Sequence, residues 1–101
     1  MVHHVVMWKL KNSAEGKTKE ENALIFKERF EALFGVIEEI RTIYIGINLK
    51  SAPESNFDVI LTSHFDNFDD LNTYSADPRH VVIVDWVKKV IEQRIAIDFE
   101  R

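Results

Sequence analysis

The chain has 101 residues, of which 46% are hydrophobic and 30% charged, with a formal net charge of −4 and no cysteine. This size and composition are typical of one globular domain with one core, here expected to span residues 1–101. The negative charge argues against binding to nucleic acids or membrane surfaces, because both need a concentrated basic face. The lack of cysteine rules out disulfides and thiolate chemistry and favours a reducing, cytoplasmic location.

Residues 2–11 form the first predicted strand, because apolar side chains alternate along it. One of its faces is apolar apart from a single imidazole and carries Val2, His4, Val6, Trp8 and Leu10. The opposite face is itself half apolar, at Val5 and Met7. Both sides of the sheet are therefore expected to be covered.

A helix is predicted to begin at Thr18, which forms a T-x-x-E capping box with Glu21. Apolar residues then recur at the 3.6-residue period and mark a face that packs on the core. These are Ala23, Phe26, Phe30, Leu33 and Ile37. Gly35 is the expected left-handed stop near the end of this helix. Residues 12–17, before this helix, are one of the only two segments where the sequence leaves room for disorder.

Two further strands are predicted at residues 40–49 and 57–65, separated by a polar loop that contains Pro53. Gly46, inside the first of them, marks either a bulge or a close approach of another part of the chain. In the second, Phe57, Val59, Leu61 and Phe65 share one face. Residues 49–56, the loop between them, are the other segment where the sequence leaves room for disorder.

The last third of the chain predicts two helices and a strand. A short helix begins after Asp66 or Asn67 and ends by Ser75, and Asp77-Pro78 then supplies an N-cap and a first-position proline for a second helix. That helix includes the run VVIVDWVKKVI, which β-propensity alone would place in a strand. Residues 94–101 are the final predicted strand.

The resulting order β-α-β-β-α-α-β predicts a ferredoxin-like α+β fold, with a four-stranded antiparallel sheet and helices on one face. Such a sheet leaves its second face open to water. Because that face carries Val5 and Met7, we expect two chains to pair sheet to sheet as a homodimeric α+β barrel.

The order of elements and several short motifs resemble the stress-responsive A/B barrel (Dabb) family over nearly the whole chain. The motifs are His4-Val5-Val6, Gly46-Ile47-Asn48, Phe57-Asp58-Val59, Phe65-Asp66, Tyr74 with Pro78 and His80, and Ile97-Asp98-Phe99. The resemblance implies a barrel-forming homodimer in a family where most members have no established activity. A plant branch is a polyketide cyclase that closes an aromatic ring by aldol chemistry without a metal or organic cofactor.

The resemblance also implies a set of site residues in a pocket between sheet and helices. His80 matches the catalytic base, Asp98 the carboxylate that orients it, and Tyr74 and His4 two further pocket residues. This chemistry is physically reasonable, because an imidazole titrates near neutrality and a phenol can donate to a developing enolate. The alternative is structural: His80 donates to a backbone carbonyl or to Asp98 and fixes a helix to a strand.

Trp8 and Val59 complete the expected ligand-binding residues. The chain departs from the cyclase pattern at two positions: Asp77 replaces a histidine common before the proline, and Val59 lies where the cyclase has a pocket histidine. No organic cofactor is expected. A metal triad of His4, His80 and Asp98 is disfavoured, because no two of these ligands have the close spacing of strong metal motifs.

Three hypotheses for function follow. The first is a homodimer with a pocket for an aromatic or polyketide-like small molecule, in which His80 carries out cofactor-free acid/base chemistry. The second is a non-catalytic stress protein, which predicts a filled core beside His80. The third is a cofactor-free monooxygenase, which differs in requiring molecular oxygen.

Overall fold

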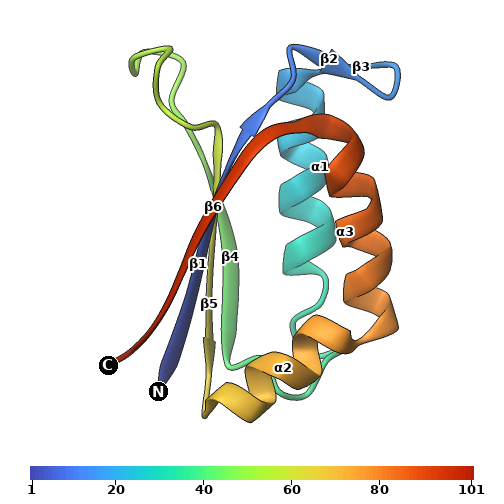
Figure 1. Ribbon diagram of the computed structural model, residues 1–101. Coiled ribbons are helices and arrows are strands. Elements are labelled where there is room, and N and C mark those ends of the chain that lie inside the picture. The colour runs from blue at the N-terminus through green and yellow to red at the C-terminus, as the bar shows by residue number, and fades with distance from the viewer.

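The computed structural model describes all residues, Met1–Arg101, and has the predicted order of elements with one additional hairpin. The elements are β1 (Val2–Leu10), β2 (Ser13–Ala14), β3 (Lys17–Thr18), α1 (Lys19–Glu31), β4 (Thr42–Ile47), β5 (Val59–Phe65), α2 (Phe68–Ala76), α3 (Pro78–Val90) and β6 (Ile91–Glu100). The four long strands form an antiparallel sheet in the order β4-β5-β1-β6. The three helices lie on one face of it (Figure 1), which confirms the ferredoxin-like fold.

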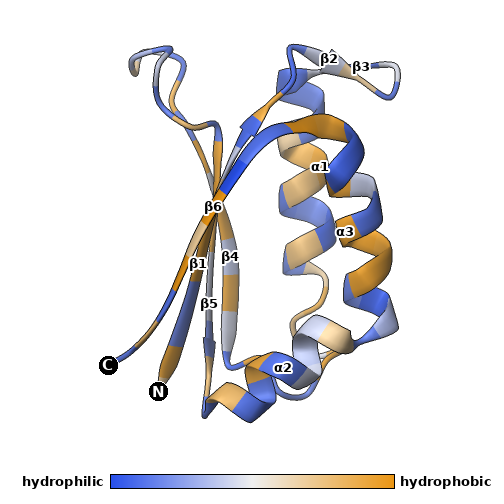
Figure 2. Ribbon diagram, viewed as in Figure 1, coloured by the Kyte–Doolittle hydropathy of each residue, from blue (hydrophilic) through white to orange (hydrophobic).

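The core lies between the helices and the sheet face toward them, here called the inner face. Twenty buried hydrophobic residues form one cluster there. The strands contribute alternate residues to it, as the period of two requires: Val2, Val6, Trp8 and Leu10 from β1, Ile43 and Ile45 from β4, and Val59, Leu61 and Phe65 from β5. Apolar residues also recur along α1 and α3 (Figure 2).

Helix α1 begins with the predicted capping box but ends earlier than its apolar stripe. Thr18 Oγ1 accepts from the Glu21 backbone N–H, and the Glu21 carboxylate accepts from the Thr18 N–H. The helix stops at Glu31, so Leu33 and Ile37 lie in turns yet remain buried. Gly35 has a φ of 79° in one of those turns, so the prediction that it ends the helix is wrong.

Residues 12–17, one of the two segments where the sequence leaves room for disorder, form the small hairpin β2–β3. Glu15 and Gly16 both have positive φ, at 52° and 75°, as a tight two-residue hairpin turn requires. The hairpin is tied to α1 because the buried Asn22 side-chain amide donates to the Ala14 carbonyl at 3.1 Å. The loop after β4 is also held in place, since Lys9 Nζ donates to the Glu54 carbonyl at 3.0 Å.

Several predicted boundaries shift by a few residues. β6 begins at Ile91 rather than Arg94, because the chain becomes extended directly after α3 without a loop. Gly46 marks a close approach and not a bulge: a Cβ there would lie 2.9 Å from the Ile60 side chain, and the β4–β5 register is unbroken. The bulge of this sheet lies instead between Lys9 and Leu10, where β1 pairs with β6.

The face of the sheet away from the helices, here called the outer face, is largely apolar and uncovered. By the strand registers it carries Val5, Met7, Tyr44, Ile60, Ile95, Ile97 and Phe99. Ile97 is 60% exposed and Tyr44 is 53% exposed.

None of the three helices has the length and apolar character needed to span a membrane.

Candidate functional site

Four of the predicted site residues meet at one end of the inner face. His4 comes from β1, Asp98 from β6, Tyr74 from α2 and His80 from α3. His4 and Asp98 are directly opposed in the β1–β6 register, so their side chains share the inner face. His4 Nδ1 donates to the Asp98 carboxylate at 2.5 Å. The strand pairing therefore fixes this imidazole–carboxylate pair.

The junction of α2 and α3 brings Tyr74 and His80 together. Asp77 caps α3 by accepting from the Arg79 backbone N–H at 2.9 Å, and Pro78 occupies the first helical position. The Arg79 side chain also bonds the Asp77 carboxylate and, with that backbone bond, lowers the pKa of Asp77 to about 2. The new helix direction places the rings of Tyr74 and His80 with centroids 4.3 Å apart.

The hydrogen bond of His80 determines which ring nitrogen is free. Its Nδ1 lies 3.1 Å from the Ser75 carbonyl oxygen, which can only accept, so Nδ1 carries the proton. In the neutral ring Nε2 is then a lone-pair base. Burial is the main cause that lowers the pKa of His80, and the charges of His4 and Arg94 lower it further. The hydrogen bond to the Ser75 carbonyl and the charge of Asp77 raise this pKa, but they do not reverse the shift. The imidazole is therefore held in its neutral form at neutral pH.

Tyr74 presents a buried phenol with no hydrogen-bond partner. Its ring contacts Phe65, at a centroid distance of 5.1 Å, and lies edge-on to His4 at 6.5 Å. The hydroxyl makes no hydrogen bond to any protein group. Burial raises the pKa of Tyr74 well above the ordinary value for a phenol, so the O–H stays protonated and able to donate.

The expectation that Asp98 orients His80 is wrong. Asp98 stands across the ladder from His4 and bonds to that ring, while His80 is held by the Ser75 carbonyl. The physical reason is the register, which sequence alone does not provide. His80 therefore links the first turn of α3 to the end of α2, and does not join a helix to a strand.

Trp8 and Val59, the remaining predicted ligand-binding residues, lie further along the inner face. They are direct partners in the β1–β5 register, and both are buried. Trp8 packs against Phe26 and Phe30, with ring centroids 5.0 and 5.6 Å away. Both residues therefore belong to the aromatic core beneath α1, although Trp8 Nε1 is a second buried polar atom without a partner.

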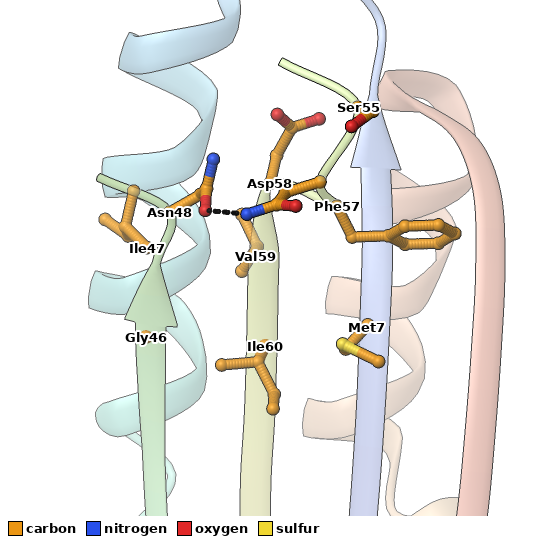
Figure 3. Close-up of a pocket in the computed structure, with 10 residues that line it drawn as sticks. Met7, Gly46, Ile47, Asn48, Ser55, Phe57, Asp58, Val59 and Ile60 are labelled. Carbon is orange, nitrogen blue, oxygen red and sulfur yellow. Dashed lines mark hydrogen bonds between the residues drawn. The ribbon is translucent and has the colours of Figure 1, made fainter. Parts of the chain in front are cut away.

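Three surface hollows are formed elsewhere. One of about 530 Å³ opens on the outer face, where Met7, Phe57 and Ile60 line it beside Gly46 (Figure 3). A polar one of about 740 Å³ lies between the loop after β4 and the start of α1, and a small apolar one of about 160 Å³ lies over β1 and β6. None of the three is lined by His4, Tyr74 or His80.

Sequence reasoning missed the outer-face hollow, although Gly46 was its one visible signal. The missing side chain of Gly46 lets the Ile60 side chain approach its backbone, and both residues line the hollow beside the turn at residues 55–58. No group of three or more His, Asp or Glu side chains is arranged to hold a metal ion, so the triad of His4, His80 and Asp98 is not assembled.

The antiparallel sheet with helices on one face defines a ferredoxin-like α+β protein. The profile of the Stress responsive A/B Barrel Domain, or Dabb, matches residues 2–101. The chain therefore belongs to the Dabb family, as its motifs suggested. None of the curated proteins compared with the chain matches it significantly.

Solved structures show the same fold. A dimeric protein of unknown function with a ferredoxin-like fold from Bacteroides fragilis is 35% identical, with a TM-score of 0.81 over 99% of this chain and 95% of that one. A dimeric ferredoxin-like protein of unknown function from Thermobifida fusca is 18% identical, with a TM-score of 0.80 over 99% and 90%. A hydroxynitrile lyase from Passiflora edulis is 15% identical, with a TM-score of 0.77 over 97% and 90%.

Proposed function

We propose that the chain binds a small carbonyl compound, aromatic or polyketide-like, beside His80, and that His80 acts on it as a general base without a cofactor. One observation carries this proposal. The Nε2 lone pair of a neutral imidazole lies beside a buried phenol whose hydroxyl has no partner. A buried polar group without a partner costs free energy, so its retention favours a role with a ligand.

The chemistry follows from the two groups. His80 Nε2 takes a proton from the carbon next to the carbonyl, and the Tyr74 hydroxyl donates to the enolate oxygen that forms. The lowered pKa of His80 keeps the base unprotonated at neutral pH, and the raised pKa of Tyr74 keeps the donor protonated. The His4–Asp98 pair borders the same site and fixes one ring nitrogen of His4 as a donor. The resulting enolate can then attack a second carbonyl, as an aldol closure requires.

The name of one fold relative, a hydroxynitrile lyase, supports small-molecule chemistry on this scaffold. At 15% identity it shows the fold alone. The reaction class proposed here therefore depends on the residues of this chain and not on that relative.

The experiment measures exchange of the acetophenone methyl protons with D2O by NMR. The wild-type protein should accelerate exchange, and His80→Gln should lower the rate by about 10²- to 10⁴-fold, the usual contribution of a general base. Tyr74→Phe removes only the hydroxyl and should lower it by about 10²-fold. His64→Gln, on the outer face, is the matched control and should leave the rate unchanged. Exchange that is equally fast in His80→Gln would remove the catalytic role.

The assembly that we propose is a homodimer joined through the outer faces of two sheets. The large exposed apolar surface there favours burial against a second copy, and the Bacteroides fragilis relative is described as dimeric. A cytoplasmic location stays a prediction from the sequence.

A second function, a non-catalytic dimer in which assembly itself is the function, is favoured by one observation. None of the three hollows described above is lined by His80, which favours a role for the protein that needs no large ligand chamber there. The two functions differ in the exchange assay: the non-catalytic dimer predicts no acceleration at all. The monooxygenase alternative has no such support in the structure.

A further inference from the structure

The inner face of the sheet is covered unevenly, and its last strand is open. The β1 residues Val2, Val6 and Trp8 are buried on this face, whereas their direct partners on β6 are exposed: Glu100, Ala96 and Arg94. The helices therefore cover β1 but leave the inner side of β6 accessible. This strip, here called the open flank, adjoins the site because Asp98 belongs to it.

On the open flank, a carboxylate and a guanidinium lie on either side of a small residue. Asp98, Ala96 and Arg94 are alternate residues of one strand, so all three project from the inner face. The Asp98 carboxylate is already bonded to His4. Ala96 adds only a methyl group, which leaves room over the middle of the strip. Asp98 is four positions after Arg94 in the strand, so their Cα atoms lie about 13 Å apart.

Arg94 has no partner of its own within the chain. It makes no hydrogen bond or ion pair, although five other Lys or Arg side chains form ion pairs with carboxylates. By the strand registers it is the one Lys or Arg on the inner face of the sheet. It projects from the same face of β6 as Asp98, whose carboxylate bonds His4 beside the Tyr74 and His80 rings.

Two buried donors without partners belong to residues next to the open flank, one near each end. Arg94 is the direct β1–β6 partner of Trp8, whose buried Nε1 donor is unsatisfied, and the Tyr74 hydroxyl is the other unsatisfied donor of the inner face. A guanidinium and two unused N–H or O–H donors all favour an acceptor with negative charge.

We infer that the open flank binds a small carboxylate and that Arg94 is its counter-ion, so that the substrate of the site is an anionic carbonyl compound such as an aromatic keto acid. This inference rests on the proposed function for the position of the reacting carbonyl at Tyr74 and His80. Arg94 then acts as a residue that determines specificity, since it holds the carboxylate while the other end of the molecule reacts. Arginine suits this role because its planar fork matches both carboxylate oxygens.

The test compares two ligands that differ in one group. Isothermal titration calorimetry is carried out with 4-acetylbenzoate, whose carboxylate and acetyl carbonyl lie at opposite ends of the ring, and with 4-methylacetophenone, in which a methyl group replaces the carboxylate. The wild-type protein should bind 4-acetylbenzoate more tightly. Arg94→Gln should weaken 4-acetylbenzoate binding by about 10- to 100-fold, as expected for a hydrogen bond between charged groups, and leave 4-methylacetophenone unchanged. The affinity of Arg94→Lys for the carboxylate ligand should fall between those of the wild type and Arg94→Gln, because lysine keeps the charge without the planar fork of arginine.

Arg101→Gln is the matched control, since it removes the same charge just beyond the end of β6, and it should bind like the wild type. Equal affinity of the wild type for both ligands would overturn the inference, as would unchanged 4-acetylbenzoate binding in Arg94→Gln or the absence of 4-acetylbenzoate binding. Each of these results leaves acetophenone exchange by His80 intact. Loss of that exchange activity is the separate failure of the proposed function.

Discussion

His3 and His4 are neighbours in the sequence but lie on opposite faces of the sheet. His4 faces the helices and donates to Asp98 beside Tyr74. His3 faces outward, stacks on Phe99 with ring centroids 4.9 Å apart, and lies 4.0 Å from the ring of His64. No hydrogen bond holds the ring of His3. The same residue type therefore takes part in a hydrogen-bonded polar cluster on one face and in a stack of rings on the other.

The comparison shows that the two faces meet different requirements. Buried polar atoms need partners, so those that lack them on the inner face, Tyr74 Oη and Trp8 Nε1, indicate a place for a ligand. The outer face combines its histidine rings with exposed apolar side chains such as Tyr44, Ile95 and Ile97, which indicate a place for another protein surface. Each difference can be tested by changing one residue on one face.

The largest expected effect is in the core between the helices and the inner face, at Phe30 of α1. Its side chain is fully buried and packs against Trp8 and Phe26. Phe30→Ala leaves a cavity that these rings cannot fill, and should lower the free energy of unfolding by about 3–5 kcal/mol. Urea denaturation followed by circular dichroism measures this change.

The matched control lies four residues further along, at Phe34. That side chain is 58% exposed, so Phe34→Ala should change the free energy of unfolding by no more than about 0.5 kcal/mol. Equal losses from the two substitutions would show that the inner face is not the main core, and the comparison of the two faces would fail.

The next effect concerns the outer face and assembly. Ile97 is 60% exposed and lines the small apolar hollow over β1 and β6. Ile97→Asp would place an unpaired charge in a sheet-to-sheet interface, and the protein should become monomeric at micromolar concentration in light scattering. Val82→Asp, on the exposed side of α3, is the control and should leave the dimer intact. A wild-type protein that is already monomeric would contradict the proposed assembly.

The sequence was sufficient to predict most of the fold because its local signals agreed with each other. The capping box at Thr18, the Asp77-Pro78 start of α3 and the alternation in β1 each have one physical meaning. The hairpin β2–β3 was missed, because its strands have two residues each and Glu15 adopts a positive φ that few residues favour.

The site was only partly predictable, for a reason of geometry. The resemblance to the Dabb family identified Tyr74, His80, His4 and Asp98, but the pairing of Asp98 with His4 depends on the register between β1 and β6. Registers over ninety residues of sequence are set by the whole sheet and not by a local pattern. The role of Arg94 was missed for the same reason, since its inward direction follows from its partner, Trp8.

The smallest effect is a dependence of stability on pH, and it tests whether the inner face disfavours charge at His80. Burial lowers the pKa of His80 below its unfolded value of 6.5, so the folded state binds this proton less readily than the unfolded state. The stability that neutral His80 provides is therefore complete above pH 6.5 and is lost as the pH falls through the lowered pKa. His80→Gln has no group that titrates at this position, so it lacks this pH-dependent contribution to stability. Urea denaturation between pH 8 and pH 5 should show the wild type losing more stability than His80→Gln, while at pH 8 the difference between the two proteins reflects only packing and hydrogen bonding. Parallel pH profiles for the two proteins would mean that the ring is solvated, and His80 would then resemble the histidines of the outer face.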